Sequence, residues 1–461
     1  MPRRSSPRVW ILGTLVLLVG VAGLVSYLFW RQSVPGVRVT GTPPSHVGPK
    51  TPLPLVLEAT RGNVVEAEVR VVQGGTAAAV ARQQTPAPRV ELTATFDASA
   101  GLQEGGATLE VWARDDFWRP LSPAQRALVS APVTLDFTPP KIEILTLTPY
   151  VSPGGAGIVV FRAGDASRAE TRVGALAFPT FPLGPAGTRV GFFALPHDFG
   201  KGAGIVLTAE DEARNSASRG IAAEVLPRRF RADTVEITDA FLQAKVPELL
   251  PQHPPSQPLL GAFLTINRDQ RRQAEEEKRR VAARTQDRPL WEGAFLQPRN
   301  TQVFSNFAEA RTYRYQGRAV DRQIHFGYDL ASTKRAAVPA ANNGVIAFAG
   351  PLTIYGNTII VDHGLGLMTL YAHLSTIEVK VGDRVDKGQV IGRTGTTGLA
   401  TGDHLHYEVL VHGVSVTPLE WWDAKWIRDR IGGPLRTAGL PDLDGSDGRA
   451  QRPGASPPRT R

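Results

Sequence analysis

Three patterns of hydrophobic and polar positions succeed one another along the chain. The first is VWILGTLVLLVGVAGLVSYLFW at residues 9–30, an uncharged apolar run that is long enough, as a helix, to cross a bilayer. A buried core helix of this length would normally carry some charged or amide side chains. A cleaved signal peptide would have a shorter apolar region and a small-residue cleavage site, whereas this run ends in FWRQ. The pattern predicts an uncleaved transmembrane helix at 9–30, which charge alone does not orient because arginines occur on both sides.

Residues 36–226 show the second pattern, short alternating apolar runs broken by Gly and Pro, such as ATLEVWARDD and GAGIVLTAEDEARN. Alternation with a period of two is typical of antiparallel strands that bury one face. The paired prolines of TPP at 138–140 favour a junction, since they stop strand pairing and stiffen the chain. We therefore predict immunoglobulin-like sandwiches at 36–137 and 138–226. The region gathers no catalytic side chains, because His46 and His197 stand alone.

The third pattern is helical and predicts a connector at 236–286. Its second run, LLGAFLTINRDQRRQAEEEKRRVAARTQ, begins apolar and continues with charges of both signs. We interpret this run as a solvated helix that docks by its N-terminal end. Glycine-rich β-type runs then return and predict a domain at 292–430, and residues 431–461 have the composition of a disordered tail. The chain as a whole is predicted to be mainly β.

The amino-acid composition limits which kinds of binding site the chain can form. The chain has no cysteine, which excludes disulfides and thiolate metal sites, so any metal must be held by nitrogen and oxygen. The net charge is +9, but the basic residues are spread widely and are not interleaved with aromatic residues, so nucleic-acid binding has only weak support and is not expected. Six of the nine histidines fall between residues 325 and 412, and this clustering indicates a metal site with nitrogen ligands.

The residues that can form such a site occur in three short segments. They are His325 and Asp329 in IHFGYDLAS, His373 in YAHLS, and His404 and His406 in HLHYE. Zinc hydrolases use three protein ligands and keep a fourth position open for water. On a strand, His404 and His406 share one face, so one imidazole can bind the metal while the other acts as an acid, a base or a hydrogen-bond donor. An isolated HxH pair is more often part of a polar sheet surface, and the other two segments favour the metal site.

Five segments that include these residues, HFGYDLAS, VPAANNGVIAFAG, YGNTIIVDHGLGLMTLYAHLS, VKVGDRVDKGQVIGRTGTTG and TGDHLHYEV, together resemble the lysostaphin/LytM-type zinc metallopeptidases. Members of that family cut the peptide part of bacterial peptidoglycan. The resemblance implies that His325, Asp329 and His406 bind one Zn²⁺ ion, that His373 and His404 serve catalysis, and that the domain is an antiparallel β-sheet groove walled by loops. None of the five is replaced, which separates this chain from degenerate members that lack ligands and activate other wall enzymes.

Other residues near these segments receive structural interpretations. His363 and His412 stand beside glycines at strand-to-turn junctions, where an imidazole commonly bonds to the backbone. Asp362 is also interpreted as structural. Glu408 shares the strand face of His406, so it either orients an imidazole or makes a structural hydrogen bond.

One segment departs from the family pattern. In SNFAEARTY, Ala308 stands where the family commonly has a glycine before its arginine, so the cleft wall is expected to differ there. Arg311 and Tyr313 are candidate substrate contacts.

These observations predict a membrane-anchored zinc endopeptidase that hydrolyses peptide bonds in the stem peptides or cross-links of bacterial peptidoglycan. Peptidoglycan lies outside the cytoplasmic membrane. We therefore expect a single-pass anchor in the cell inner membrane, residues 1–8 in the cytoplasm and the soluble part in the periplasm or outside the membrane. Expected partners are peptidoglycan peptides, the membrane, and envelope proteins that contact the sandwiches, which otherwise serve as a spacer. Two alternatives remain: a non-catalytic peptidoglycan-binding or amidase-activating envelope protein, and a purely structural envelope protein.

Overall fold

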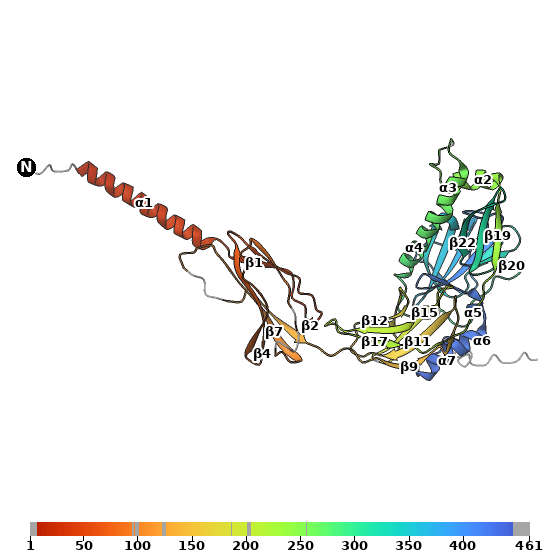
Figure 1. The fold of residues 1–461 in the computed structure, drawn as a ribbon, viewed down its shortest axis with the longest axis horizontal. Helices are drawn as coiled ribbons and strands as arrows, with labels where there is room; N and C mark the ends of the chain where they lie inside the picture. Colours follow the sequence, from red (N-terminus) through yellow and green to blue (C-terminus); the bar gives the residue numbers. More distant parts are fainter. Residues whose placement is uncertain are drawn as a thin grey trace, which may run out of the picture. The chain divides into compact units, whose positions relative to one another are not determined.

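The structure is a computed structural model, and it describes residues 7–94, 96, 101–121, 126–185, 187–200, 204–254 and 256–445 (Figure 1). It is mainly β, as the sequence predicts. The chain divides into two compact units, Met1–Pro139 with Glu210–Ser216, and Pro140–Ala209 with Ala217–Arg461. The second unit begins at the paired prolines and contains the connector, the C-terminal β domain and the second sandwich apart from its segment Glu210–Ser216.

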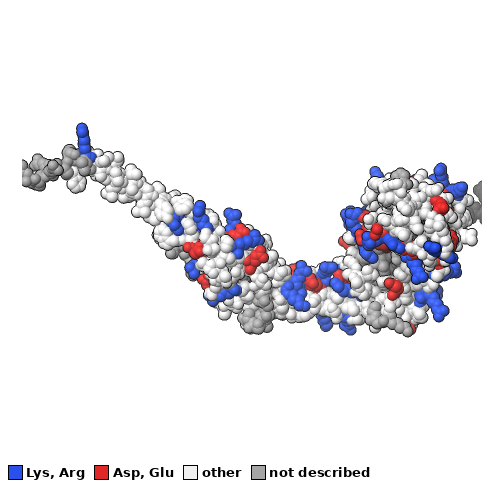
Figure 2. Space-filling model, turned by 45° about the horizontal axis from the view of Figure 1, so that its top comes forward, with Lys and Arg blue, Asp and Glu red and all other residues white. Residues whose placement is uncertain are grey.

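The apolar run at the N-terminus lies in helix α1 (Pro7–Ser33). Its stretch Trp10–Ser33 has a mean hydropathy of 2.3 and is not buried inside the protein. Figure 2 shows this helix in white between its two ends, without charged side chains on the visible face. Its length and composition fit a membrane anchor, although a signal sequence near the N-terminus has the same properties. Residues 1–6 of the predicted cytoplasmic segment lie outside the described part of the chain.

The first sandwich combines a three-stranded and a five-stranded sheet. The smaller sheet has the order β1 (Val37–Thr40), β3 (Leu55–Ala59), β6 (Arg89–Leu92), and the larger β2 (His46–Val47), β8 (Val129–Leu135), β7 (Gly105–Asp115), β4 (Val64–Gln73), β5 (Thr76–Gln83). Alternate residues such as Val69 and Val71 on β4 are fully buried, as the period of two predicts. This unit has a hydrophobic core of its own, which also buries Phe96.

The second sandwich is built from two four-stranded sheets and a short parallel pair. Their orders are β14 (Phe181–Pro182), β15 (Thr188–Ala194), β11 (Ala156–Arg162), β9 (Glu143–Leu147); β13 (Leu176–Pro179), β12 (Arg168–Val173), β16 (Ile205–Glu210), β17 (Ser216–Gly220); and β10 (Tyr150–Val151), β18 (Glu224–Val225). Its core is continuous with that of the C-terminal domain. The ring of Phe192 on β15 lies 6.2 Å, between centroids, from Trp421 of that domain.

The C-terminal domain is organised around one large antiparallel sheet. Its order is β20 (Gln302–Ser305), β23 (Tyr328–Ala331), β31 (Leu405–Val411), β27 (Leu367–Ala372), β26 (Asn357–Gly364), β25 (Gly344–Pro351), β29 (Arg384–Val385), with β32 (Val414–Val416) beside β31 and a separate sheet β24 (Ala337–Pro339), β30 (Val390–Arg393), β28 (Thr376–Ile377). On β31, Tyr407 and Val409 point into the core shared with the second sandwich. Leu410 points to the opposite face, where the connector packs.

The connector begins with a strand and continues as helices. Strand β19 (Ala232–Ile237) pairs in parallel with β21 (Glu309–Tyr315), which pairs with β22 (Arg318–His325); the helices are α2 (Asp239–Leu249), α3 (Leu259–Thr265), the π-turn η2 (Ile266–Gln270) and α4 (Arg271–Ala282). Figure 1 shows α4 alongside the strands of the domain. The expectation that this helix docks only by its N-terminal end is wrong, because α4 itself buries Ala274, Lys278 and Val281, which recur every three or four residues on one face.

The folded part of the C-terminal segment extends beyond residue 431, where the composition predicts that disorder begins. After α5 (Pro418–Trp422) the chain forms α6 (Ala424–Ile427), η4 (Arg428–Gly432) and α7 (Gly433–Thr437). Ile431, Leu435 and Leu440 are buried in the core shared with the second sandwich. Disorder from residue 431 is therefore wrong for residues 431–445, since widely spaced apolar residues suffice to dock short helices on an existing core. Residues 446–461 lie outside the described part.

Candidate metal and catalytic site

The large sheet, its loops and the neighbouring sheet β19–β21–β22 bring together all five site residues that the sequence singles out. His325 ends β22, Asp329 lies on β23 directly opposite His406 on β31, His373 follows β27, and His404 precedes β31. None of the five is more than 7% exposed. The antiparallel register therefore joins segments that lie far apart in the sequence into one buried polar cluster.

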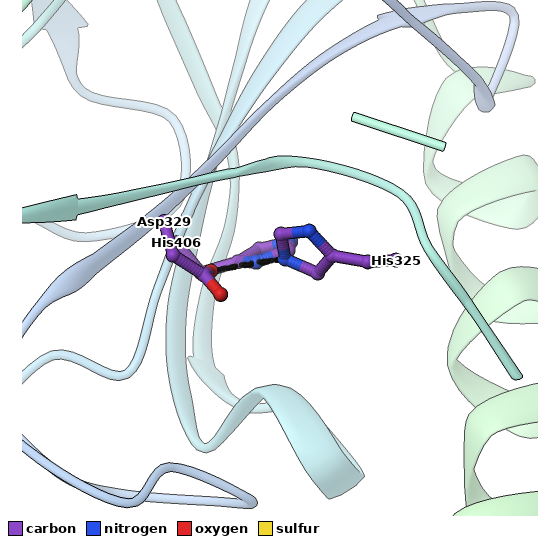
Figure 3. A group of neighbouring side chains, drawn as sticks. All are labelled: His325, Asp329 and His406. Atoms are coloured by element: carbon purple, nitrogen blue, oxygen red, sulfur yellow. Dashed lines mark hydrogen bonds and ion pairs between the residues drawn. The ribbon is translucent and has the colours of Figure 1, made fainter. Parts of the chain in front are cut away.

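Three of these residues converge on a common point (Figure 3). His325 Nε2 lies 3.0 Å from Asp329 Oδ1 and 3.0 Å from His406 Nδ1, and His406 Nδ1 lies 2.9 Å from Asp329 Oδ1. Atoms at the corners of such a triangle can each approach one metal ion at the 2.0–2.2 Å or so that zinc–nitrogen and zinc–oxygen bonds require. The donor set of two imidazoles and one carboxylate fits a zinc ion, and it leaves a coordination position for water.

The outer nitrogen of each imidazole in this triangle has a protein acceptor. His325 Nδ1 lies 2.9 Å from the carbonyl oxygen of Asn306, and His406 Nε2 lies 2.9 Å from Glu408 Oε1. An N–H donated to these oxygens leaves the lone pair of the other nitrogen directed at the triangle. Glu408 thus orients the imidazole of His406, one of the two interpretations that the sequence left open.

Arg311 holds the carboxylate of the triangle. Its Nη2 donates to Asp329 Oδ2 over 2.9 Å, which leaves Oδ1 for the two histidines. Tyr313, the other candidate substrate contact, is buried against Phe263 of the connector and is not placed to meet a substrate. Ala308 keeps a left-handed backbone with φ of 58°, a conformation that favours glycine.

His373 and His404 lie beside the triangle with their rings 4.8 Å apart between centroids. Each Nδ1 faces a backbone carbonyl oxygen, that of Thr397 at 2.8 Å for His373 and that of Gly402 at 2.7 Å for His404. An Nδ1–H donated to a carbonyl leaves Nε2 as the acceptor, and the Nε2 of His404 lies 3.5 Å from Asp329 Oδ1. His373 has φ of 61°, a strained value of the kind that collects at functional sites.

The protonation preferences of the cluster follow from burial and from the carboxylates of Asp329 and Glu408. Burial lowers the pKa of His325 to about 4 and, together with the neighbouring histidines, lowers the pKa of His373 well below its usual value. Burial alone would raise the pKa of Asp329, but the adjacent histidines hold it well below the usual range. The pKa of His406 is raised against the effect of burial, because Asp329 and Glu408 both face it. A metal cation binds neutral imidazoles and an ionised carboxylate, so metal binding competes with protonation of His406.

Gly327 shows why the chain needs a glycine between His325 on β22 and Asp329 on β23. A Cβ atom at this position would lie 2.7 Å from the His406 ring and 2.6 Å from the carbonyl oxygen of Tyr407. No side chain fits at such distances. The glycine therefore permits the turn between β22 and β23 to approach β31 closely, which brings the three residues of the triangle together.

Comparison with known proteins agrees with this geometry. Residues 323–418, which include all five site residues, match peptidase family M23. The chain carries a peptidase M23 domain. The sequence resemblance to lysostaphin/LytM-type peptidases is thereby confirmed.

Several proteins resemble the M23 domain. DD-carboxypeptidase/endopeptidase Mpg of Neisseria meningitidis serogroup B is 38% identical over 117 residues, which make up 25% of this chain and 27% of that protein. Peptidoglycan DD-endopeptidase ShyA of Vibrio cholerae is 37% identical over 119 residues, 26% of this chain and 27% of that protein. The crystallised catalytic domain of lysostaphin from Staphylococcus simulans is 28% identical, with 27% of this chain and 92% of that chain covered and a TM-score of 0.23. The chain thus spans about a quarter of the length of these curated relatives.

Two further histidines of the M23 domain lie outside the cluster. His363 is fully buried between the carbonyl oxygen of Asn343, at 2.7 Å, and Thr369 Oγ1, at 2.8 Å. His412 stacks on Phe181 of the second sandwich with ring centroids 5.9 Å apart. Burial lowers the pKa of each to about 4, so both are neutral packing groups, as the sequence suggested.

Lys278 of α4 is the residue near the M23 site that sequence reasoning missed. The sequence pattern predicts a solvated helix here, yet the side chain of Lys278 is fully buried and its Nζ lies 2.9 Å from Glu408 Oε2. The available signal was its spacing, four residues after Ala274 and three before Val281, which puts it on the apolar stripe of the helix.

Proposed function

We propose that this chain is a membrane-anchored zinc endopeptidase that hydrolyses peptide bonds in the stem peptides or cross-links of bacterial peptidoglycan. The observation that carries the proposal is the buried triangle of His325, Asp329 and His406 inside an M23 domain, with His373 and His404 beside it. The names of the relatives, a DD-carboxypeptidase/endopeptidase and a peptidoglycan DD-endopeptidase, support the same substrate class.

In this proposal His325 Nε2, Asp329 Oδ1 and His406 Nδ1 hold one Zn²⁺ ion. The ion supplies Lewis acidity, which activates water and polarises the peptide carbonyl. The protein residues keep this donor set in place. The Asn306 carbonyl and Glu408 each accept the outer N–H of an imidazole, so both metal-facing nitrogens keep their lone pairs.

His373 and His404 handle protons and the developing negative charge at the scissile carbonyl. Each donates its Nδ1–H to a backbone carbonyl, which leaves the lone pair on Nε2, and the Nε2 of His404 faces Asp329. An imidazole held in this way accepts a proton from the attacking water, passes it to the leaving amine, or, once protonated, donates a hydrogen bond to the oxyanion. Because burial lowers the pKa of His373, this residue is a neutral acceptor at the start of the cycle.

The location follows from the substrate. Peptidoglycan lies outside the cytoplasmic membrane, so α1 would be a single-pass anchor in the cell inner membrane with the M23 domain in the periplasm or outside the membrane. The length and hydropathy of Trp10–Ser33 support this. The first sandwich, which has its own core, would act as a spacer or bind envelope partners.

The full chain purified in detergent tests the proposal. We expect near-stoichiometric zinc, digestion of purified peptidoglycan into peptide-cleaved fragments identified by mass spectrometry, and loss of digestion after chelation that added zinc reverses. The variant Asp329→Asn is the control, because an amide is a poorer zinc ligand than a carboxylate. A wild-type chain that binds zinc but releases no fragments, while it binds peptidoglycan or stimulates an amidase, would establish the non-catalytic alternative instead.

A further inference from the structure

The connector helix α4 contributes a buried cation to the M23 domain. Lys278 has no exposed side-chain surface, and its Nζ lies 2.6 Å from Glu275 Oε1 and 2.9 Å from Glu408 Oε2. It also donates to Ser415 Oγ at 3.1 Å and to the hydroxyl of Tyr355 at 3.3 Å. Burying an ammonium group without compensation is very costly, so this lysine is held in place by the carboxylates around it.

Glu408 is the residue that links Lys278 to the metal triangle. Its Oε1 accepts from the Tyr355 hydroxyl at 2.6 Å and lies 2.9 Å from His406 Nε2. Its Oε2 accepts from Ser415 Oγ at 2.6 Å and from Lys278. The two oxygens of one fully buried carboxylate therefore join the connector helix on one side to the imidazole of His406 on the other.

This arrangement has a geometric consequence for the metal site. The position of the Glu408 carboxylate sets the direction in which His406 donates its Nε2–H, and so the direction of the lone pair on Nδ1. Without Lys278, Glu408 loses its only cationic partner within 4.0 Å among the described residues other than His406 itself. A buried carboxylate in that situation moves or takes up water, and the imidazole that it orients moves with it.

We propose that Lys278 is a positioning residue for the metal site, and that docking of α4 and metal binding are thermodynamically coupled through Glu408. The inference rests on the proposed zinc site. It adds a residue that influences this site from outside the region matched to family M23. Hydrophobic packing of α4 does not require a charge, since Ala274 and Val281 supply the apolar stripe. Lys278 is the position on this stripe that reaches the carboxylate beside His406.

The first test compares Lys278→Met with Arg280→Met in the full chain. Both variants remove one positive charge from α4, but Arg280 is an exposed residue paired with Glu277 on the same helix. Zinc affinity is measured by competition with a chromophoric chelator, well below the melting temperature of each variant, and circular dichroism verifies the fold. Lys278→Met should bind zinc tenfold or more weakly, the effect typical of losing a group that orients a ligand, and Arg280→Met should match the wild type. Unchanged zinc affinity in folded Lys278→Met would overturn the inference.

The second test needs no variant and holds even if Lys278→Met fails to fold. Coupling is reciprocal, so zinc must stabilise the docked helix as much as the docked helix favours zinc. Amide hydrogen exchange of the wild-type chain should slow in residues 271–282 when zinc is added, with the first-sandwich strand β4 as the unaffected reference. An amide exchange rate in α4 that stays the same at saturating zinc would contradict the inference. A wild-type chain that binds no zinc at all would instead overturn the proposed function.

Discussion

The second sandwich is expected to unfold together with the M23 domain, because the two share one core. Phe192 on β15 is fully buried, and it packs against Trp421, which is fully buried in α5 and also contacts Trp291 and Phe295. A polar connection crosses the same boundary, where Glu420 accepts hydrogen bonds from Arg228 and from the backbone N–H of Ala156. The substitution Phe192→Ala therefore removes packing that both parts use.

The size of the effect follows from burial. Replacing a fully buried phenylalanine with alanine costs about 3–5 kcal/mol of the free energy of unfolding, from lost transfer energy and the residual cavity. The second unit has roughly 300 residues, and an unfolding entropy of about 2.1 cal/mol/K per residue gives about 0.6 kcal/mol/K for the unit. Phe192→Ala should thus lower the melting temperature of the unit by about 5–8 °C.

The assay follows the M23 domain through its proposed activity. The full chain is heated in detergent to a series of temperatures, and residual peptidoglycan hydrolysis is measured beside calorimetry at one scan rate. The matched control is Phe96→Ala, which empties an equally buried site in the first unit. We expect Phe192→Ala to inactivate at a lower temperature than the wild type and Phe96→Ala to inactivate at the wild-type temperature.

Two results would refute this reasoning. If Phe192→Ala produced a separate early transition while activity survived to the wild-type temperature, the second sandwich would be an independent module despite its shared core. If Phe96→Ala lowered the inactivation temperature as much as Phe192→Ala, the division into two units would not describe the unfolding.

Three further outcomes are expected. His406→Ala should lose zinc and activity together because a proposed ligand is gone, whereas His404→Ala should keep near-stoichiometric zinc and turn over on the order of a hundredfold more slowly; metal analysis and turnover assays decide, and zinc loss in His404→Ala with retention in His406→Ala would reverse the roles. Burial lowers the pKa of His363 to about 4, against about 6.5 in an unfolded chain. Between these two pH values the unfolded state binds more protons than the folded state, so the free energy of unfolding decreases as the pH falls through that window. Denaturant titrations should therefore show the penalty of His363→Gln shrinking by about 3 kcal/mol between about pH 7 and pH 4, and a constant penalty would show that burial of the neutral imidazole is not the cause. Deletion of residues 1–33 should move the protein from the membrane fraction to the soluble fraction on immunoblots, whereas unprocessed full-length chain in the soluble fraction would exclude an anchor.

Local patterns determined much of this protein. An apolar run long enough for a bilayer, period-two alternation and a cysteine-free histidine cluster are read within short windows, because helix and strand periodicity and metal preference are local properties. They predicted the mainly β fold, the apolar helix and the five residues that the structure brings together. The HxH spacing predicted that His404 and His406 face the same side, because successive residues of extended chain alternate between faces, and the structure places His404 directly before β31 and His406 on it.

Only the tertiary structure decided what those elements pack against. Lys278 looked like a solvated helix residue because its compensating carboxylate, Glu408, lies 130 positions away in the sequence. The second sandwich looked like a separate module because its outward residues, such as Phe181, give no sign that His412 will cover them. Residues 431–440 looked disordered because Ile431, Leu435 and Leu440 are too sparse to fold alone, and they are ordered by a core that other segments build. A residue is buried only when another part of the chain covers it, and that part often lies far away in the sequence. A short segment therefore shows which of its side chains share one face, but it does not show which residues will pack against that face.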